Sequence, residues 1–290
     1  MKAIILGANG MIGSTMFKVL REKEDLDVWG TLRSAQDSRF FSRTDASRLI
    51  DGIDASLPDS LLRVFAAVRP DVIINCVGLT KHRPEADDPL QSLELNAILP
   101  HRLSRICEAA GARLVHVSTD CVFLGSKGAY AESDAPDAQD FYGRSKHMGE
   151  VVSSSHAITL RTSTIGHELH THYGLLEWFL SQQGQCKGFS RAIFSGLPTV
   201  VFAQVVRDVV LPRPELHGLY HVAAKAINKL DLLQLIAKVY QKEIEIVPDD
   251  SLVIDRSLDG ARFAAATGYV APHWEELINL MHARTAKEYA

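Results

Sequence analysis

The sequence predicts an α/β protein built on a doubly wound parallel sheet, and three observations carry that prediction. Through the first 163 residues, short apolar runs typical of buried strands alternate with longer segments typical of helices. A glycine-rich turn, Gly7–Gly13, joins the first strand to the first helix. Polar or basic residues follow several strands directly, and the carboxyl ends of parallel strands form the edge where ligands bind.

Each element of this first region has its own basis in the sequence. Strands rich in Val, Ile and Leu are expected at residues 2–6, 26–32, 71–77, 113–117 and 158–161. Helices are expected at residues 14–22, 57–68, 93–110 and 141–152. Arg69-Pro70 ends the second of these helices, and Gly111 ends the third.

Beyond Ser163 the pattern becomes less regular, which predicts a second, smaller part of the fold. We expect a Rossmann-type domain over residues 1–163 and a smaller C-terminal substrate-binding lobe over residues 164–290. The chain is expected to return to the first domain near 198–212. Within the lobe, residues 167–173 and 184–196 look irregular, 200–211 reads as a strand followed by a helix, and 218–223, 229–240, 243–247 and 274–287 read as regular elements.

Composition narrows the class of protein. The 290 residues are 46% hydrophobic and 23% charged with a net charge of −4, so neither a nucleic acid nor an anionic membrane is an expected partner. The N-terminal apolar run is too short for a signal peptide, and no apolar stretch reaches the ~20 residues that span a bilayer. A reduced, cytoplasmic protein is expected, because the four cysteines form no Cys-x-x-Cys pair. A homo-oligomer is left open.

The glycine turn predicts a phosphate site. Gly7, Gly10 and Gly13 lie between a strand and a helix, where glycine lets a pyrophosphate approach the backbone. Met11 and Ile12 open the helix, whose free N–H groups and dipole attract negative charge. A tight turn without a ligand is the alternative, but the strand before it and the helix after it favour a dinucleotide.

The end of the second strand predicts which dinucleotide binds. Arg33 follows Gly13 by 20 positions, where a carboxylate accompanies a free ribose 2′-OH and an arginine accompanies a 2′-phosphate. Arg33 therefore favours NADP(H), with NAD(H) left open and a solvated surface arginine as the alternative. Asp54 is a candidate for contact with the adenine amino group.

A phenol, an ammonium group and a hydroxyl form the predicted reacting group. Tyr142 and Lys146 are four residues apart and share one face of a helix, so the cation lowers the cost of forming phenolate. Thr119 follows the 113–117 strand. Together these residues suit carbonyl reduction: Thr119 binds the substrate oxygen, Tyr142 delivers a proton and Lys146 holds the nicotinamide ribose. Singly, each residue also suits a purely structural role.

These motifs resemble the extended short-chain dehydrogenase/reductase family, and within it the dTDP-4-dehydrorhamnose reductase-like branch. The matching elements are Gly7–Gly13, Asn75-Cys76-Val77-Gly78, Asn96, Ser118-Thr119-Asp120-Cys121-Val122-Phe123, Tyr130-Ala131-Glu132, Tyr142-Gly143-Arg144-Ser145-Lys146, Gly149-Glu150, Leu160-Arg161-Thr162-Ser163 and Ser257-Leu258-Asp259. The likeness is good to about Gly166 and patchy beyond. It implies NADPH-dependent reduction of a 4-keto-6-deoxy nucleotide sugar in deoxysugar and cell-surface polysaccharide biosynthesis.

The resemblance also assigns roles residue by residue. It makes Thr119, Tyr142 and Lys146 catalytic, and gives Thr119 and Asp120 to the sugar. It gives the cofactor to Gly10, Met11, Ile12, Asp54, Cys76, Val77, Gly78, Tyr142 and Lys146.

Three departures from the family pattern bear on the sugar more than on the reaction. Cys121 replaces a tyrosine, Cys76-Val77-Gly78 replaces an alanine-rich triplet, and Lys81-His82-Arg83 adds a basic loop. Lys81 and Arg83 are candidates for the nucleotide diphosphate, with a solvated loop as the favoured reading.

The same resemblance includes proteins with other activities. Cys121 stands where the related dehydratases carry a glutamate, which makes dehydration a poor fit. An epimerase shares the tyrosine–lysine pair and stays open, although Arg33 leans against it. A non-catalytic NADP-binding regulatory subunit, resembling that of methionine adenosyltransferase, is the alternative from another class. No metal is expected, because His167, His170 and His172 lack the spacing of a zinc helix.

Overall fold

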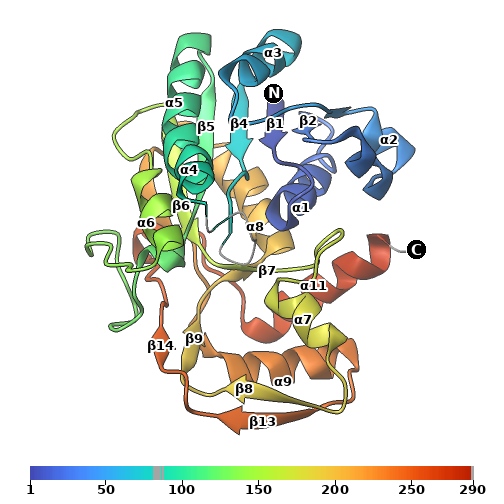
Figure 1. Ribbon diagram of the computed structural model, residues 1–290, viewed down its shortest axis with the longest axis vertical. Helices are drawn as coiled ribbons and strands as arrows, with labels where there is room; N and C mark the ends of the chain where they lie inside the picture. The colour runs from blue at the N-terminus through green and yellow to red at the C-terminus, as the bar shows by residue number, and fades with distance from the viewer. Residues whose placement is uncertain (81–85, 87, 289–290) are drawn as a thin grey trace. The chain divides into compact units, whose positions relative to one another are not determined.

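The computed structural model describes residues 1–80, 86 and 88–288, and the chain forms two compact units (Figure 1). The first unit comprises Met1–Thr119, Gln139–Leu160 and Ala203–Leu219, and the second comprises Asp120–Ala138, Arg161–Phe202 and the chain from Tyr220 onward. The chain therefore passes between the units at more points than the single boundary at Ser163 and one return.

A seven-stranded sheet with the order β11-β6-β5-β4-β1-β2-β3 forms the centre of the first unit. Its strands are β1 (Lys2–Leu6), β2 (Asp27–Thr31), β3 (Leu49–Ile50), β4 (Val72–Asn75), β5 (Arg113–Thr119), β6 (Ala157–Thr162) and β11 (Gly218–His221). β1 pairs in parallel with both β2 and β4, so Ile4 lies opposite Trp29 on one side and Ile73 on the other. The strand order reverses at β1, which confirms the doubly wound α/β prediction.

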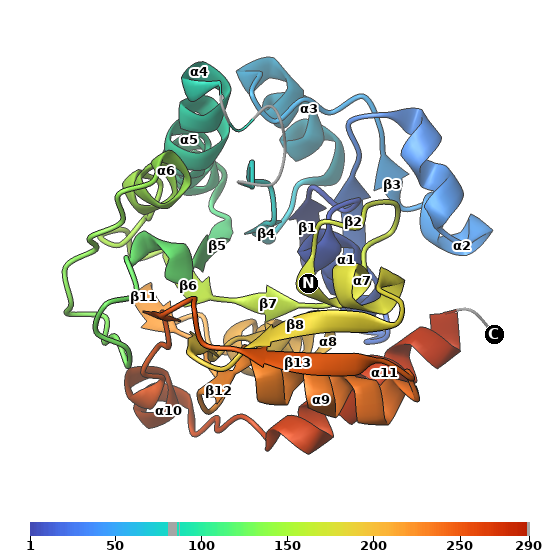
Figure 2. The same cartoon turned by 60° about the horizontal axis from the view of Figure 1, so that its bottom comes forward.

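Helices cover this sheet, and side-chain alternation along β1 shows how. Ile4 and Leu6 belong to a core that includes Leu61 and Val64 of α3 and Leu103 of α5. Figure 2 shows α3 and α5 beside the strands of this sheet. The helical segments up to α6 are α1 (Met11–Leu20), η1 (Ala35–Phe40), α2 (Arg43–Ala46), α3 (Pro58–Val68), α4 (Pro89–Ser92), η3 (Leu93–Ile98), α5 (Leu99–Ala110), η4 (Asp120–Val122) and α6 (Phe141–Met148).

Two arginines hold the returning segment in the first unit. Arg113 at the start of β5 donates to the carbonyl oxygens of Val210 (2.8 Å) and Leu216 (2.7 Å). Arg207 donates to the carbonyl oxygen of Val19 in α1 at 3.1 Å. The segment contains the end of α8 (Thr199–Val205) and the π-helical turn η5 (Val206–Val210).

The second unit contains small sheets and four longer helices. β8 (Gln185–Phe189) pairs in parallel with β13 (Glu245–Asp249), and β9 (Ala192–Phe194) lies between β12 (Ile227–Asn228) and β14 (Ile254–Asp255). β7 (Thr164–Ile165) pairs with β10 (Leu197–Pro198). The helices are α7 (Leu175–Ser181), α9 (Lys229–Tyr240), α10 (Ala261–Thr267) and α11 (Trp274–Glu288).

Three expectations from the sequence were wrong in detail. Residues 184–196 are not irregular, because β8 finds its partner β13 about 60 residues away, a pairing that no local pattern reveals. Residues 199–210 are helical and contain no strand, because their β-branched side chains pack in a buried helix. The helix expected over 141–152 ends at Met148, and Gly149 is its C-cap.

Candidate functional site

The glycine turn between β1 and α1 leaves no room for a side chain at Gly7 or Gly13. Gly7 has a φ of +83°, and a Cβ built on it would lie 2.8 Å from Cγ2 of Val77. A Cβ on Gly13 would lie 2.0 Å from the carbonyl oxygen of Gly7. Gly10 is the N-cap of α1 and offers no side chain to its first amides. The turn therefore presents bare backbone N–H groups at a helix N-terminus, a site suited to an anion.

The segment after β4 is held in place by a buried asparagine. Asn96 lies in the π-helical turn η3, where its Oδ1 accepts the N–H of Leu79 (2.8 Å) and its Nδ2 donates to the carbonyl oxygen of Leu79 (3.0 Å). The same amide donates to Oγ of Ser145 in α6 at 3.2 Å. Asn96 thus links the Cys76–Leu79 segment to the helix that carries Tyr142 and Lys146.

Lys146 is buried at the end of β5. Its side chain is in a residue only 5% exposed, and its Nζ donates to the carbonyl oxygen of Val117 at 2.9 Å. A Cβ on Gly78 would lie 3.7 Å from the same Nζ, so the ammonium group faces the segment after β4. Burial lowers the pKa of Lys146 to about 8, although the charge of Glu150 opposes this shift.

Tyr142 lies on the same helix as Lys146, and Thr119 ends the strand that Lys146 bonds. Asp140 caps α6 by accepting the N–H of Gly143 at 2.8 Å, which sets the start of the helix one residue before Tyr142. Tyr142 is half-buried and lies one helical turn before Lys146. Thr119 is the last residue of β5 and is 8% exposed. The hydroxyl and the ammonium therefore lie at the same strand end.

Gly149, whose role could not be assigned from local patterns, makes this arrangement possible. A Cβ on Gly149 would lie 1.9 Å from the carbonyl oxygen of Asn96, so α6 and η3 cross at backbone contact. Any larger residue would push apart the helix with Lys146 and the turn with Asn96. The Gly149-Glu150 pair after the lysine was visible in the sequence, but its purpose depends on this crossing.

A neutral histidine lies beneath the lysine. Asn75 accepts the N–H of Val77 through Oδ1, so its amide nitrogen faces Nδ1 of His116 at 3.1 Å and the histidine proton resides on Nε2. That Nε2 is buried without a hydrogen-bond partner among the residues described. Burial, together with the charge of Lys146, holds the pKa of His116 well below its usual value.

The predicted nucleotide residues meet at the ends of β2 and β3. Arg33 is exposed just beyond β2, and Asp54 is half-buried where Ile53 donates to the carbonyl oxygen of Leu32. The hydroxyl of Ser56 bonds to Asp54 at 2.7 Å and lowers the pKa of that carboxyl, with a smaller contribution from the charge of Arg33. Arg33 thus stays available at the surface, whereas the Asp54 carboxylate is engaged with Ser56.

The second unit begins directly after Thr119. Asp120 is 8% exposed and opens the short turn η4, where its carbonyl oxygen accepts the N–H of Phe123. Arg256 donates through Nε to the carbonyl oxygen of Phe123 (2.8 Å), and one of its terminal nitrogens lies 3.5 Å from Sγ of Cys121. Asp120 and Cys121 therefore stand on a turn that Arg256 braces.

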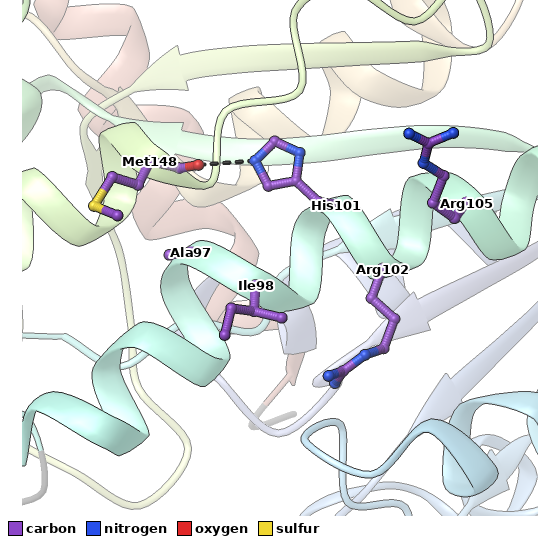
Figure 3. A pocket seen from close by; sticks show the side chains of 6 residues that line it. All are labelled: Ala97, Ile98, His101, Arg102, Arg105 and Met148. Atoms are coloured by element: carbon purple, nitrogen blue, oxygen red, sulfur yellow. Dashed lines mark hydrogen bonds between the residues drawn. The ribbon is translucent and has the colours of Figure 1, made fainter.

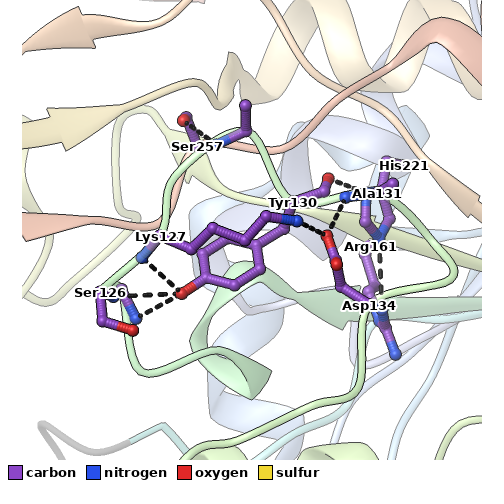
Figure 4. Close-up of polar contacts among 10 residues, drawn as sticks. Ser126, Lys127, Tyr130, Ala131, Asp134, Arg161, His221 and Ser257 are labelled. Carbon is purple, nitrogen blue, oxygen red and sulfur yellow. Dashed lines mark hydrogen bonds and ion pairs between the residues drawn. The ribbon is translucent and has the colours of Figure 1, made fainter.

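A tyrosine organises the loop that follows this turn (Figure 4). The phenol oxygen of Tyr130 accepts the backbone N–H groups of Gly125, Ser126 and Lys127 at 3.1–3.2 Å. Its ring stacks on Phe123, with centroids 4.0 Å apart. The loop is thereby pinned from within by a buried side chain.

A buried arginine and a histidine complete this network. Arg161 can only donate, so Nε2 of His221 accepts from it at 3.3 Å, and Nδ1 of His221 donates to the carbonyl oxygen of Tyr130 at 2.9 Å. The guanidinium also lies 5.1 Å from the Phe123 ring centroid. His221 is therefore neutral, and its tautomer is fixed.

One protein family matches this chain over nearly its whole length. The model of the family described as RmlD substrate binding domain matches residues 1–286. The chain belongs to this family. The resemblance drawn from the sequence motifs is thereby confirmed.

Relatives of this RmlD-family chain include proteins named as a methionine adenosyltransferase subunit and proteins named as reductases. It is 28% identical over 242 residues to methionine adenosyltransferase 2 subunit beta of Xenopus tropicalis, covering 76% of this chain and 66% of that protein. It is 29% identical over 172 residues to dTDP-4-dehydrorhamnose reductase of Mycobacterium tuberculosis, covering 57% and 50%. The chain thus spans half to two thirds of the length of these curated relatives.

A solved structure gives the same fold over the whole chain. The dTDP-4-dehydrorhamnose reductase of Bacillus anthracis, solved in complex with NADP, superposes with a TM-score of 0.79 at 20% identity and covers 98% of each chain. The Rossmann-type α/β fold of this RmlD-family chain is therefore confirmed.

Some sequence expectations for the RmlD-family chain fall outside the site or outside the described residues. Lys81, His82 and Arg83 lie outside the residues that the structure describes. His167 contacts Oε1 of Glu177 at 2.6 Å and the Tyr240 hydroxyl at 3.0 Å. Within residues 1–80, 86 and 88–288, no group of three or more His, Cys, Asp or Glu is arranged to hold a metal ion.

The remaining features are the character of the helices and a hollow on the surface. None of the described helices is long and apolar enough to cross a membrane. A surface hollow of about 440 Å³ is lined by residues of η3, α5 and α6 (Figure 3), where His101 Nε2 contacts the carbonyl oxygen of Met148 at 2.8 Å. It is lined by Ala97, Ile98, His101, Arg102, Arg105 and Met148.

Proposed function

We propose that this protein is a cytoplasmic, NADPH-dependent reductase of a 4-keto-6-deoxy nucleotide sugar, acting in deoxysugar and polysaccharide biosynthesis. One observation carries the proposal: the buried Lys146 ammonium group faces Gly78 and bonds the strand end that carries Thr119. A lysine whose pKa is brought near 8 by burial is typical of a functional site. The named reductases among the relatives agree with this chemistry.

The residues of the first unit fit a nicotinamide dinucleotide. Gly7 and Gly13 let β1 and α1 approach closely, and Gly10 offers no side chain to the first amides of α1, so the amides of Met11 and Ile12 would donate to a pyrophosphate. When bound, the cofactor supplies a hydride to the carbonyl carbon. The exposed Arg33 would bind the 2′-phosphate. Asp54, Cys76, Val77 and Gly78 would flank the adenosine and nicotinamide ends.

The protein's own residues supply the proton and hold the substrate oxygen. The Tyr142 hydroxyl donates a proton to the carbonyl oxygen as the C=O bond is reduced to an alcohol, and solvent then restores the phenol. The Lys146 ammonium group favours the phenolate that remains. Thr119 donates a hydrogen bond to the same oxygen, and Asp120 bonds the sugar.

A second function is favoured by one specific observation. The similarity to methionine adenosyltransferase 2 subunit beta extends over 76% of this chain, more than the 57% matched by the reductase of M. tuberculosis. A regulatory protein of that kind would bind NADP(H) and turn over no sugar. The intact Thr119, Tyr142 and Lys146 favour the reductase.

One experiment separates the two candidates. Purified protein is incubated with NADPH and a panel of 4-keto nucleotide sugars, and the loss of reduced nicotinamide is followed by absorbance. The reductase gives substrate-dependent oxidation that is lost in Tyr142→Phe. Tight NADPH binding without oxidation on any substrate in the panel would support the regulatory function.

A further inference from the structure

Glu150 is a buried carboxylate that the mechanism above does not use. The residue is 7% exposed and follows the C-cap of α6. Its Oε1 accepts the hydroxyl of Ser118 at 2.7 Å, and its Oε2 lies 3.1 Å from Nδ1 of His147, whose side chain is 48% exposed. Burying a carboxylate costs several kcal/mol unless other charges or donors compensate. A carboxylate that is buried at this cost is therefore expected to have a role.

Glu150 and Lys146 bind neighbouring residues of one strand. Lys146 donates to the carbonyl oxygen of Val117, and Glu150 accepts from the side chain of Ser118. The next residue along β5 is Thr119. Lys146, in the last turn of α6, bonds Val117, and Glu150, just after the helix, bonds Ser118. The end of α6 is thus joined to the end of β5 by one cation and one anion.

The charge state of Lys146 depends on its ionisable neighbours. Burial raises the pKa of the Cys76 thiol to about 12, so it is uncharged at neutral pH. His116 is neutral as well, because burial holds its pKa well below the usual value. Among the described residues, the groups that interact electrostatically with Lys146 lie just after β4, on β5 and just after α6, and of these only Glu150 carries a charge at neutral pH. The other ionisable or charged groups on the helix itself are Tyr142, the exposed Arg144 and the half-exposed His147.

We propose that Glu150 is a positioning residue, which keeps Lys146 as an ammonium ion facing Gly78 and fixes the end of α6 against the end of β5. Its importance for turnover rests on the proposed reductase function. Its effect on Lys146 does not, because both groups belong to the same buried network whatever the substrate.

The test measures the ionisation of Lys146 directly. The protein is labelled with lysine enriched in ¹³C at Cε, and the Lys146 resonance is assigned by its loss in Lys146→Met. In the wild type we expect a titration midpoint near 8. Glu150→Gln removes the charge but keeps an acceptor for Ser118, and we expect it to lower the midpoint by about one pH unit.

Three further variants separate charge from structure. Glu150→Met, which removes both the charge and the acceptor, is expected to lower the midpoint as much as Glu150→Gln. Ser118→Ala and His147→Asn retain the carboxylate and are expected to leave the midpoint in place. A midpoint that stays near 8 in both Glu150 variants, or that falls equally in Ser118→Ala, overturns the proposal. If Glu150→Gln does not fold, Glu150→Met compared with Ser118→Ala makes the same distinction.

NADPH affinity provides a second measurement, for which the direction of the pH dependence is predicted. The cofactor phosphates and ribose favour the ammonium form, so affinity should fall as pH rises through the Lys146 pKa. At pH 7.5 Glu150→Gln should bind NADPH about threefold more weakly than wild type, and at pH 6 the two should converge. A shifted resonance with unchanged affinity would count against the proposed cofactor site while supporting the role of Glu150.

Discussion

The two units use buried polar groups for different purposes. In the first, Asn96, Asn75 and Glu150 bond the segments next to Lys146, whose pKa burial brings to about 8. In the second, Tyr130 accepts three backbone N–H groups and fixes a loop. A buried group poised to ionise points to chemistry, whereas a phenol that only accepts hydrogen bonds points to stability. Substitutions in each unit should therefore fail in different ways.

The largest effect is expected from Tyr142→Phe in the first unit. Turnover should fall by about 10² or more, because a general acid is lost, while NADPH affinity stays nearly unchanged. The measurement is steady-state NADPH oxidation, paired with a fluorescence titration of the cofactor. Turnover at the wild-type level would remove the phenol from the mechanism.

Gly149→Ala should be the most destabilising change at the first site. The new Cβ meets the carbonyl oxygen of Asn96 at 1.9 Å, and forcing α6 away from η3 should cost about 2–3 kcal/mol of the free energy of unfolding. Denaturant unfolding measures this cost. Gly260→Ala is the matched control in the second unit, because its Cβ would meet nothing closer than 3.8 Å. Equal stability of the two variants would contradict the helix crossing.

Arg33→Glu should change coenzyme preference without affecting the fold. Replacing a cation by an anion at the proposed 2′-phosphate site should weaken NADPH binding about 30-fold, and NADH binding far less. Titrations with both coenzymes measure the ratio. The control Arg105→Glu alters another exposed arginine, on α5, and should leave the ratio unchanged. Parallel losses for both coenzymes would rule out the 2′-phosphate assignment.

Tyr130→Phe should give the smallest effect, and one confined to stability. Three backbone N–H groups lose their acceptor, which should cost about 1–2 kcal/mol of unfolding free energy, partly offset where water reaches the loop. NADPH affinity should remain at the wild-type value. Tyr173→Phe, at an exposed tyrosine, serves as the control. A loss of cofactor binding in Tyr130→Phe would contradict the claim that Tyr130 contributes to stability alone.

The sequence allowed the first unit to be predicted far better than the second. Strand β1 was predicted at its observed bounds, and α3, β4 and β5 to within a few residues, because the strands are apolar runs and α3 is an amphipathic segment ended by the local signal Arg69-Pro70. In the second unit β8 was missed. Gly188 interrupts its pattern where α9 packs closely, with a Cβ position 2.7 Å from Leu230.

The sequence by itself determined the doubly wound class, the glycine turn, and the i, i+4 spacing of Tyr142 and Lys146, because these depend on local geometry and short periods. Only the tertiary structure decided that Gly149 contacts Asn96, that Glu150 is buried beside Ser118, and that residues 120–138 belong with the second unit. Those facts depend on which distant segments share a buried environment. Burial rather than sequence spacing sets the ionisation of Lys146.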